Sequence, residues 1–138
     1  MTIDYRPNTA PNMEDLVDLY QSVGWTEYTK DPHLLAEAVE SSLFVVTAHA
    51  NGRLIGLARA VGDGLTIVYL QDILVHPDYQ RQGIGRELFH RVFQPFQDVR
   101  QKVLMTDNDD AQIAFYESLG FTEIRNLPHP TNVYVKFG

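Results

Sequence analysis

The residues with the clearest chemical potential form a short glycine-containing stretch in the second half of the chain. Gln80-Arg81-Gln82-Gly83-Ile84-Gly85-Arg86 follows an apolar, partly β-branched run and leads into a segment whose apolar residues recur at helical spacing. Two glycines two positions apart remove Cβ atoms where a ligand touches the backbone. The N–H groups of a first helical turn lack intrahelical partners and bind phosphate well. The stretch therefore predicts a site for a phosphate-bearing ligand, with Arg81 and Arg86 adding positive charge.

Two common phosphate-binding motifs do not fit this stretch. The dinucleotide fingerprint requires a third glycine, where the chain has Leu88, and the P-loop requires Lys and Ser or Thr, where it has Arg86-Glu87. The remaining pattern is Gln/Arg-x-x-Gly-x-Gly/Ala, filled by Gln80, Gly83 and Gly85. Here the chain resembles the GCN5-related N-acetyltransferase (GNAT) family, whose acetyl-CoA pyrophosphate loop has this pattern. An ordinary strand–turn–helix joint, with glycines for close packing, is the structural alternative.

A second stretch carries the same resemblance. The family pattern Asn-x-x-Ala-x-x-x-Tyr-x-x-x-Gly-Phe is matched at Tyr116, Gly120 and Phe121, whereas its asparagine slot holds Asp109, with Asn108 one residue earlier. The resemblance implies that Asn108 or Asp109 contacts the pantetheine arm. It also implies that Tyr116 lies near the CoA sulfur as a general acid, since a phenol can protonate a leaving thiolate. A tyrosine packed in the core is the alternative.

The strand before the glycine stretch supplies the rest of the implied site. In the family, this strand and its parallel neighbour splay apart, and the pantetheine arm bonds the backbone of the earlier strand. A backbone N–H near Leu74 would then polarise the thioester carbonyl. The cofactor-binding residues that the resemblance implies are Ile73, Leu74, Val75, Gln80, Arg81, Gln82, Gly83, Ile84, Gly85, Arg86, Asn108, Asp109 and Tyr116.

Direct attack on a thioester needs a neutral amine, so a base or a water chain must remove a proton. Asp72 is one candidate, because an acid inside an apolar strand is costly unless it is paired or used. A structural hydrogen bond to a neighbouring loop is an equal alternative for Asp72. Glu27 is a second candidate, and a solvated loop glutamate is its alternative. Trp25 and Tyr28, in the same loop, either wall an acceptor site or cover the core.

The elements that must position these residues alternate between strands and helices. Strands are expected at 2–6, 43–50, 53–61, 65–75, 99–106, 121–125 and 132–137. Helices are expected from Met13 to Gly24, from Asp31-Pro32 onward, after the glycine stretch, and at 111–119. Asn51-Gly52 predicts a tight hairpin. The order predicts an α/β fold with a mixed sheet of six to seven strands and helices on both faces, which is the GNAT order.

Composition limits the class of protein. With 138 residues, 44% of them hydrophobic and 21% charged, the chain is expected to form one globular domain, residues 1–138. We expect a cytoplasmic location and no membrane partner, because no apolar run approaches the roughly 20 residues of a membrane span and the chain starts without a signal peptide. The absence of cysteine and the spacing of the five histidines predict no metal. A formal charge of −7 disfavours nucleic acid and favours a cationic partner such as an amine.

These observations lead to one expected function and one alternative. The expected function is an acetyl-CoA-dependent N-acetyltransferase, which moves an acetyl group to a primary amine of a small molecule or peptide by direct attack. Acetyl-CoA is then the co-substrate and no metal is needed. The alternative is a non-catalytic acyl-CoA-binding sensor or partner module on the same fold. The identity of the acceptor, and the choice between monomer and homodimer, stay open.

Overall fold

The computed structural model describes residues 2–138, which divide into two compact units at Leu104/Met105. The first unit contains β1 (Ile3–Pro7), α1 (Met13–Ser22), α2 (Thr26–Thr29), α3 (Pro32–Glu40), β2 (Phe44–Ala50), β3 (Arg53–Gly62), β4 (Ile67–Val75), α4 (Ile84–Phe93) and β5 (Gln101–Leu104). Short 3-10 helices lie at Pro77–Tyr79 and Gln94–Phe96. The second unit contains α5 (Asp110–Ser118) and a 3-10 helix at Ile124–Asn126.

The strands of the first unit form one sheet in the order β1-β2-β3-β4-β5. The first four pair antiparallel, and β4 and β5 pair parallel. The hairpin between β2 and β3 turns at Asn51 and Gly52, whose φ angles are 51° and 80°. Two consecutive positive φ angles are what a tight two-residue hairpin requires, and Asn-Gly accepts them readily. The expected meander and the expected parallel pair are therefore confirmed.

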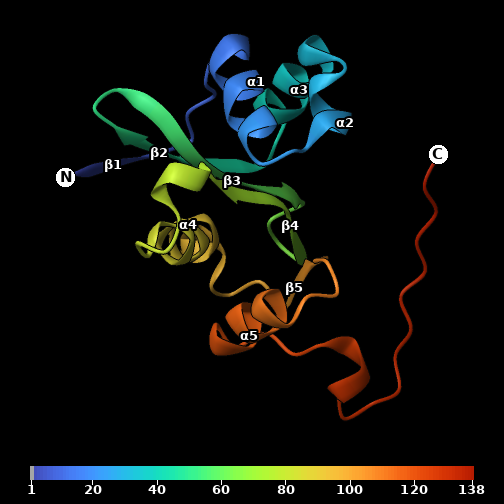
Figure 1. Cartoon of the computed structure of the whole chain (residues 1–138). Coiled ribbons are helices and arrows are strands. Elements are labelled where there is room, and N and C mark those ends of the chain that lie inside the picture. Colours follow the sequence, from blue (N-terminus) through green and yellow to red (C-terminus); the bar gives the residue numbers. More distant parts are fainter. Residues whose placement is uncertain (1) are drawn as a thin grey trace. The chain divides into compact units, whose positions relative to one another are not determined.

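Helices cover both faces of this sheet (Figure 1), with α1 to α3 on one face and α4 on the other. On the first face, Leu57 of β3 and Leu74 of β4 join the fully buried Leu16 and Tyr20 of α1 in one apolar cluster. Gly56 alternates with Leu57 and faces α4, where an added Cβ would lie 3.0 Å from Leu88 Cδ1. This glycine lets α4 approach the sheet closely. The predicted mixed α/β fold with helices on both faces is confirmed.

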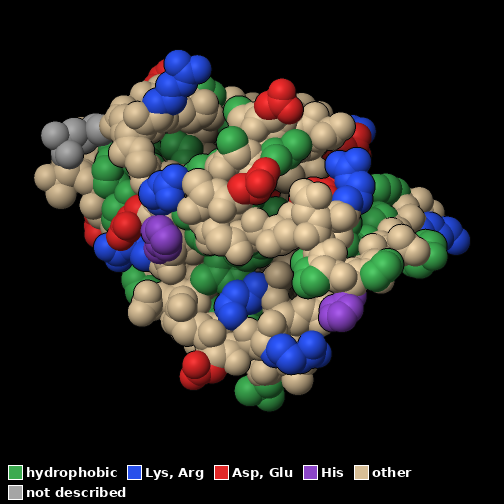
Figure 2. Space-filling model, turned by 90° about the horizontal axis from the view of Figure 1, so that it is seen from below, with side chains coloured by type: hydrophobic (Ala, Val, Ile, Leu, Met, Phe, Trp, Pro, Cys, Tyr) green, Lys and Arg blue, Asp and Glu red, His purple; other side chains and the backbone are tan. Residues whose placement is uncertain are grey.

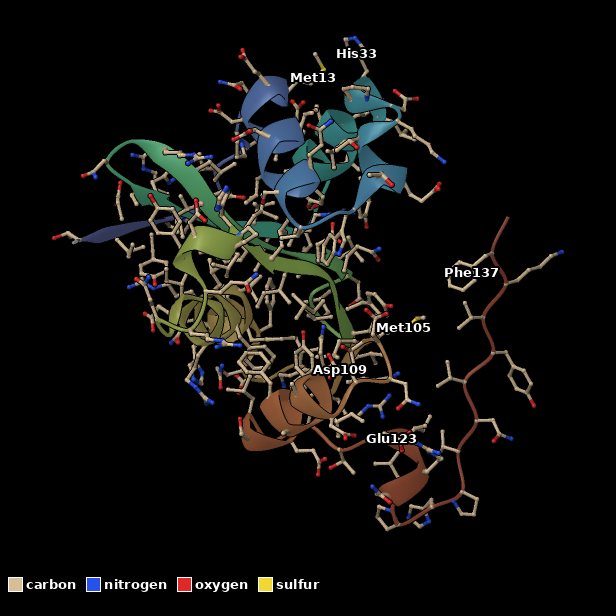
Figure 3. All side chains as sticks on the ribbon, viewed as in Figure 1. Met13, His33, Met105, Asp109, Glu123 and Phe137 are labelled. Carbon is tan, nitrogen blue, oxygen red and sulfur yellow. The ribbon has the colours of Figure 1, made fainter. Side chains whose placement is uncertain are left out.

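The sheet has five strands, and the expectation of six to seven is corrected here. No strand forms at 121–125 or 132–137, although both segments are described. Local bonds use the backbone donors of the first segment: the N–H of Phe121 donates to the Tyr116 carbonyl, 3.1 Å away, and that of Arg125 to the Glu123 carboxylate, 2.6 Å away. An extended segment also needs a ladder partner to satisfy its backbone. The apolar side chains of the last segment are exposed, among them Phe137 at 84% (Figure 3).

Basic and acidic side chains are scattered among polar ones on the face seen in Figure 2. Within residues 2–138, no helix combines the length and the apolar character that crossing a membrane would require.

Candidate active site

The glycine stretch ends at the N-terminus of α4, which differs from the other long helices in its cap. Side chains cap the helices α1, α3 and α5, through Asn12, Asp31 and Asp109. The α4 cap is Gly83, with a left-handed φ of 80° and no side chain to bond the first turn. A Cβ added at Gly83 would meet no atom within 4 Å. The Gly83 cap therefore leaves open space beside the start of α4, where the positive end of the helix dipole suits an anion.

Other side chains tie this loop to the sheet. The Gln80 amide donates to the carbonyl of Val75, 3.0 Å away, so the loop is attached to the end of β4. Ile84 is only 2% exposed and anchors the helix start in the core, which leaves its backbone for a ligand. Arg81 has a left-handed φ of 64°. Arg81, Gln82, Gly83 and Arg86 are exposed and Gly85 is half-buried.

Strand β5 pairs with only the first part of β4. The ladder runs from Ile67 opposite Gln101 to Leu70 opposite Leu104, while β4 continues to Val75. Within residues 2–138, positions 71–75 of β4 therefore have no strand paired on their β5 side, which is compatible with the gap that the GNAT resemblance implies. We refer to this side of residues 71–75 as the free edge of β4.

Backbone alternation decides which N–H groups point out of the free edge. The His76 N–H donates to the Ile55 carbonyl on β3, at 2.8 Å. Because antiparallel pairing alternates, the N–H of Leu74 points toward β3 as well, and those of Ile73 and Val75 point toward the free edge. The Gln80 bond to the Val75 carbonyl, on the same side, agrees with this direction. A backbone donor near Leu74 that faces the free edge would therefore belong to a neighbour, Ile73 or Val75.

Asp72 lies at the start of the free edge, buried under α1 and α2. Its carboxylate pairs with Arg59 on β3, with 2.6 Å between Arg59 Nε and Asp72 Oδ2. It also accepts from the Tyr20 hydroxyl at 2.9 Å and from the Tyr28 hydroxyl at 2.7 Å. Asp72 and Arg59 are 4% and 5% exposed. Although burial opposes the charge of Arg59, the Asp72 carboxylate holds the arginine pKa above its ordinary value. The structure thus gives Asp72 partners from a strand and two helices, and its role as a base stays a prediction.

The other acceptor-side residues lie on or next to α2, a short helix where a loop was expected. The Glu27 carboxylate is exposed and pairs with Lys30 at 2.7 Å. Trp25 and Tyr28 pack edge-on against the buried Tyr20, with ring centroids 5.9 and 5.1 Å away. Trp25 is 36% exposed, so these rings both cover the core and present a surface.

The remaining predicted residues belong to the second unit. Asp109 caps α5 and accepts from the Ala111 N–H at 3.0 Å, whereas Asn108 is exposed in the turn before it (Figure 3). Tyr116 lies in α5 and is 8% exposed, and burial raises the pKa of its phenol. A phenol with a raised pKa stays protonated at neutral pH, as a proton donor must.

The sequence analysis assigned no role to Arg59 or Tyr20. A signal for Arg59 was present: it is a single charge in the apolar run of β3, as Asp72 is in β4. Opposite charges inside the apolar runs of two consecutive strands predict a cross-strand pair. Tyr20 offered no such signal, because a tyrosine on an apolar helix face is common in cores.

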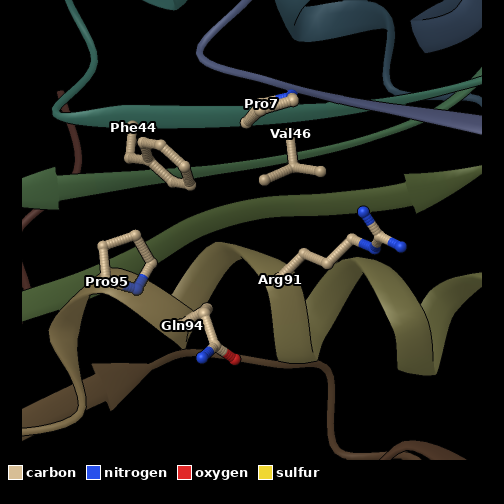
Figure 4. Close-up of a pocket in the computed structure, with 6 residues that line it drawn as sticks. All are labelled: Pro7, Phe44, Val46, Arg91, Gln94 and Pro95. Carbon is tan, nitrogen blue, oxygen red and sulfur yellow. The ribbon is translucent and has the colours of Figure 1, made fainter.

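A hollow of about 190 Å³ lies elsewhere on the first unit, between α4 and the strands β1 and β2 (Figure 4). Its lining is Pro7, Phe44, Val46, Arg91, Gln94 and Pro95. None of these residues belongs to the predicted site. No group of three or more His, Cys, Asp or Glu side chains that could hold a metal occurs among the described residues.

The acetyltransferase (GNAT) domain profile matches residues 40–123, which include the meander, the glycine loop, the free edge of β4 and α5. The chain belongs to the GNAT family. It is 33% identical to the uncharacterized N-acetyltransferase ycf52-like protein of Prochlorococcus marinus, over 78% of this chain and 61% of that protein. The chain spans 61% to 69% of the length of four such curated relatives.

Solved structures agree with this family. A GNAT acetyltransferase from Streptococcus pneumoniae TIGR4 superposes with a TM-score of 0.84 at 32% identity, over 98% of both chains. An aminoglycoside N-acetyltransferase in complex with CoA shares the fold, with a TM-score of 0.71 at 22% identity over 99% of this chain and 94% of that one. The predicted GNAT family and the predicted N-acetyltransferase class are confirmed.

Proposed function

We propose that this GNAT-family chain moves the acetyl group of acetyl-CoA to a primary amine by direct attack. The observation that supports it most is the continuity of two features in the first unit. The free edge of β4 offers backbone groups to an amide-bearing arm, and the uncapped start of α4 offers backbone N–H groups to a diphosphate. Gln80 joins the two features through Val75. The residues present therefore fit acetyl-CoA.

The roles of the side chains follow from the chemistry of the step. The amine nitrogen bonds to the thioester carbonyl carbon, the carbon–sulfur bond breaks, and the electron pair leaves on sulfur. Backbone N–H groups at Ile73 or Val75 stabilise the carbonyl oxygen as it gains charge. Tyr116 donates a proton to the leaving sulfur. Of the two candidate bases, Glu27 has the exposed carboxylate and Asp72 would first have to release a bonded partner.

Two measurements test this function. Acetyl-CoA is expected to raise the melting temperature, because a ligand at a hundred times its dissociation constant stabilises the native state by about 2.7 kcal/mol. Release of free thiol from acetyl-CoA across a panel of amines, peptides and an amine-free control then separates the enzyme from a non-catalytic acyl-CoA sensor. The absence of a thermal shift at millimolar acetyl-CoA would contradict both the enzyme and the sensor hypothesis. A shift without amine-dependent thiol release would favour the sensor.

The finer parts of the proposal concern the acceptor and the assembly. We propose a small-molecule or peptide amine as acceptor, because the CoA-bound structural neighbour is named an aminoglycoside N-acetyltransferase. We also propose that residues 1–138 work as one GNAT domain, since the family match extends over the boundary between the two units. A cytoplasmic location, the absence of nucleic acid and membrane partners, and a monomer or homodimer remain predictions from the sequence.

A further inference from the structure

The helix α2 has few internal interactions that could stabilise it. It is four residues long, none of them is buried, and its N-cap makes no side-chain hydrogen bond. Isolated helices shorter than about 12–15 residues are marginal in water, so tertiary contacts must hold this one. Those contacts include the rings of Trp25 and Tyr28 against Tyr20. The polar side-chain contacts between α2 and the sheet converge on a single atom, the hydroxyl oxygen of Tyr28.

This hydroxyl connects α2 to both strands beside the free edge. It donates to Asp72 Oδ1 at 2.7 Å and accepts from Gln71 Nε2 at 3.1 Å. Arg59 Nη2 lies 3.4 Å away, and the Arg59 guanidinium lies 5.8 Å from the centre of the Tyr28 ring. Arg59 also reaches Ser42, just after α3. The half-buried phenol is therefore bonded to an ion pair that is itself almost fully buried.

The Tyr28 hydroxyl contacts β4 where its pairing with β3 is irregular. Arg59 lies opposite Asp72 and Ala60 opposite Leu70, so Gln71 is the extra residue of a β-bulge. Bulges redirect side chains and are frequent beside active sites. Gln71 is exposed and directs its amide to Tyr28, and it is also the first residue past the end of the β4–β5 ladder. The bulge thus coincides with the start of the free edge and with the point where α2 is attached.

We propose that the Tyr28 hydroxyl is a positioning group that latches α2 and Trp25 onto the bulge of β4, and that this latch sets the acceptor side of the site. The inference rests on the proposed function for its second part, because the acceptor must approach a thioester held along the free edge. Asp72 then acts through Tyr28, keeping the hydroxyl in one direction. The buried ion pair fixes where α2 lies, a role that buried polar groups play in other folds.

The test compares Tyr28→Phe with Tyr5→Phe. The first change removes the hydroxyl and keeps the ring, so the contacts with Tyr20 remain. The control makes the same chemical change on β1, where the Tyr5 ring lies 4.6 Å from the Arg91 guanidinium. Gln71→Ala is a second variant, which removes one latch bond at an exposed position without altering the ion pair.

Two readouts measure the latch without any activity. Amide hydrogen exchange at residues 26–30 is expected to be about tenfold faster in Tyr28→Phe, as a lost hydrogen bond to a charged group implies. Trp25 is the only tryptophan of the chain, so acrylamide quenching of its fluorescence reports on the same segment and should increase. Gln71→Ala should shift both values in the same direction by less, and Tyr5→Phe should shift neither. Wild-type values in Tyr28→Phe would overturn the latch.

A kinetic readout tests the positioning role. With phenethylamine and propylamine as probes, Tyr28→Phe should raise the KM of the amine severalfold and leave the KM of acetyl-CoA unchanged. If amide exchange in α2 is faster in Tyr28→Phe but the KM of the amine is unchanged, the hydroxyl only holds α2 in place. That result would overturn its role at the acceptor side. Amine-dependent thiol release by the wild type separates these outcomes from a failure of the proposed function. If no amine releases thiol from the wild type, the proposed function and the positioning role are both lost.

Discussion

At the residue scale, the chemistry of the first unit centres on the buried pair Arg59–Asp72. Removing one member of such a pair leaves the other as an uncompensated buried charge, which typically costs about 3–5 kcal/mol. Asp72→Asn is therefore expected to lower the free energy of unfolding by that amount, measured by urea denaturation. Asp4→Asn, at an exposed ion pair with Arg6, is the matched control and should change it by less than about 1 kcal/mol. Equal stability of the two variants would show that the buried pair is not coupled to folding.

Tyr116 carries the second residue-scale prediction. Tyr116→Phe keeps the buried ring and removes only the hydroxyl, so the variant should fold and bind acetyl-CoA with an unchanged thermal shift. Its kcat is expected to fall by about a hundredfold, within the range for a positioned general acid. Wild-type kcat in Tyr116→Phe would remove Tyr116 from the acid role and leave it as a core tyrosine.

His49 gives the fold a pH dependence. Its side chain is buried on β2, and its Nδ1 has no hydrogen-bond partner among residues 2–138. Burial, followed by the positive charge of Arg6, lowers the pKa of His49, while the nearby acids Asp4 and Asp15 oppose that shift. A base with a lowered folded-state pKa binds protons better when unfolded. Its contribution to stability is therefore complete above the unfolded pKa of about 6.5 and declines as pH falls below it.

The measurement is unfolding by urea at several pH values between neutral and mildly acidic. His49→Phe is expected to flatten the decline, because it replaces the titrating ring with an apolar one of similar size. His90→Gln changes an exposed histidine on α4 and should leave the decline as it is. An unchanged pH profile in His49→Phe would assign the decline to other groups.

At the element scale, the start of α4 depends on a glycine for two separable reasons. Gly83 adopts a φ of 80°, which costs a side chain roughly 1 kcal/mol. Gly52, in the hairpin, has the same φ of 80° and likewise no atom within 4 Å of an added Cβ. Gly83→Ala and Gly52→Ala should therefore lose similar stability. Only Gly83→Ala is expected to reduce the acetyl-CoA thermal shift, because only its new methyl group faces the anion site.

This pair of variants separates backbone strain from ligand binding. Differential scanning fluorimetry with and without acetyl-CoA gives both quantities in one experiment. A full acetyl-CoA shift in Gly83→Ala would place the diphosphate elsewhere on the protein.

At the scale of the whole molecule, charge is the property that concerns partners. The formal charge is −7, and the face seen in Figure 2 carries acidic as well as basic side chains. Affinity for nucleic acid depends on neutralising several phosphates together, which a net negative charge does not favour. A fluorescent DNA duplex should therefore show no change in anisotropy with added protein at low salt. Binding that weakens steeply with salt would contradict this prediction.

Some elements of the chain could be predicted from a few neighbouring residues, and others could not. The caps at Asn12 and Asp31 and the turn at Asn51-Gly52 were predictable, because each depends on bonds within a few residues of itself. The uncapped glycine at the start of α4 was predictable for the same reason. The segments 121–125 and 132–137 carry strand-like composition, yet a strand exists only where another strand pairs with it. Whether these two segments form strands therefore depends on a pairing partner elsewhere in the chain, which the local sequence does not reveal.

The sequence by itself determined the family, the meander with its parallel strand pair, and the glycine loop that begins α4, because these depend on residue types at fixed spacing. The tertiary structure alone decided which groups Asp72 contacts, since its partners come from distant parts of the chain: Tyr20 lies 52 positions away and Tyr28 lies 44. Periodicity marks a residue as buried but does not name its neighbours. The ion pair, the bulge at Gln71 and the free edge of β4 all arise from how strands and helices pack.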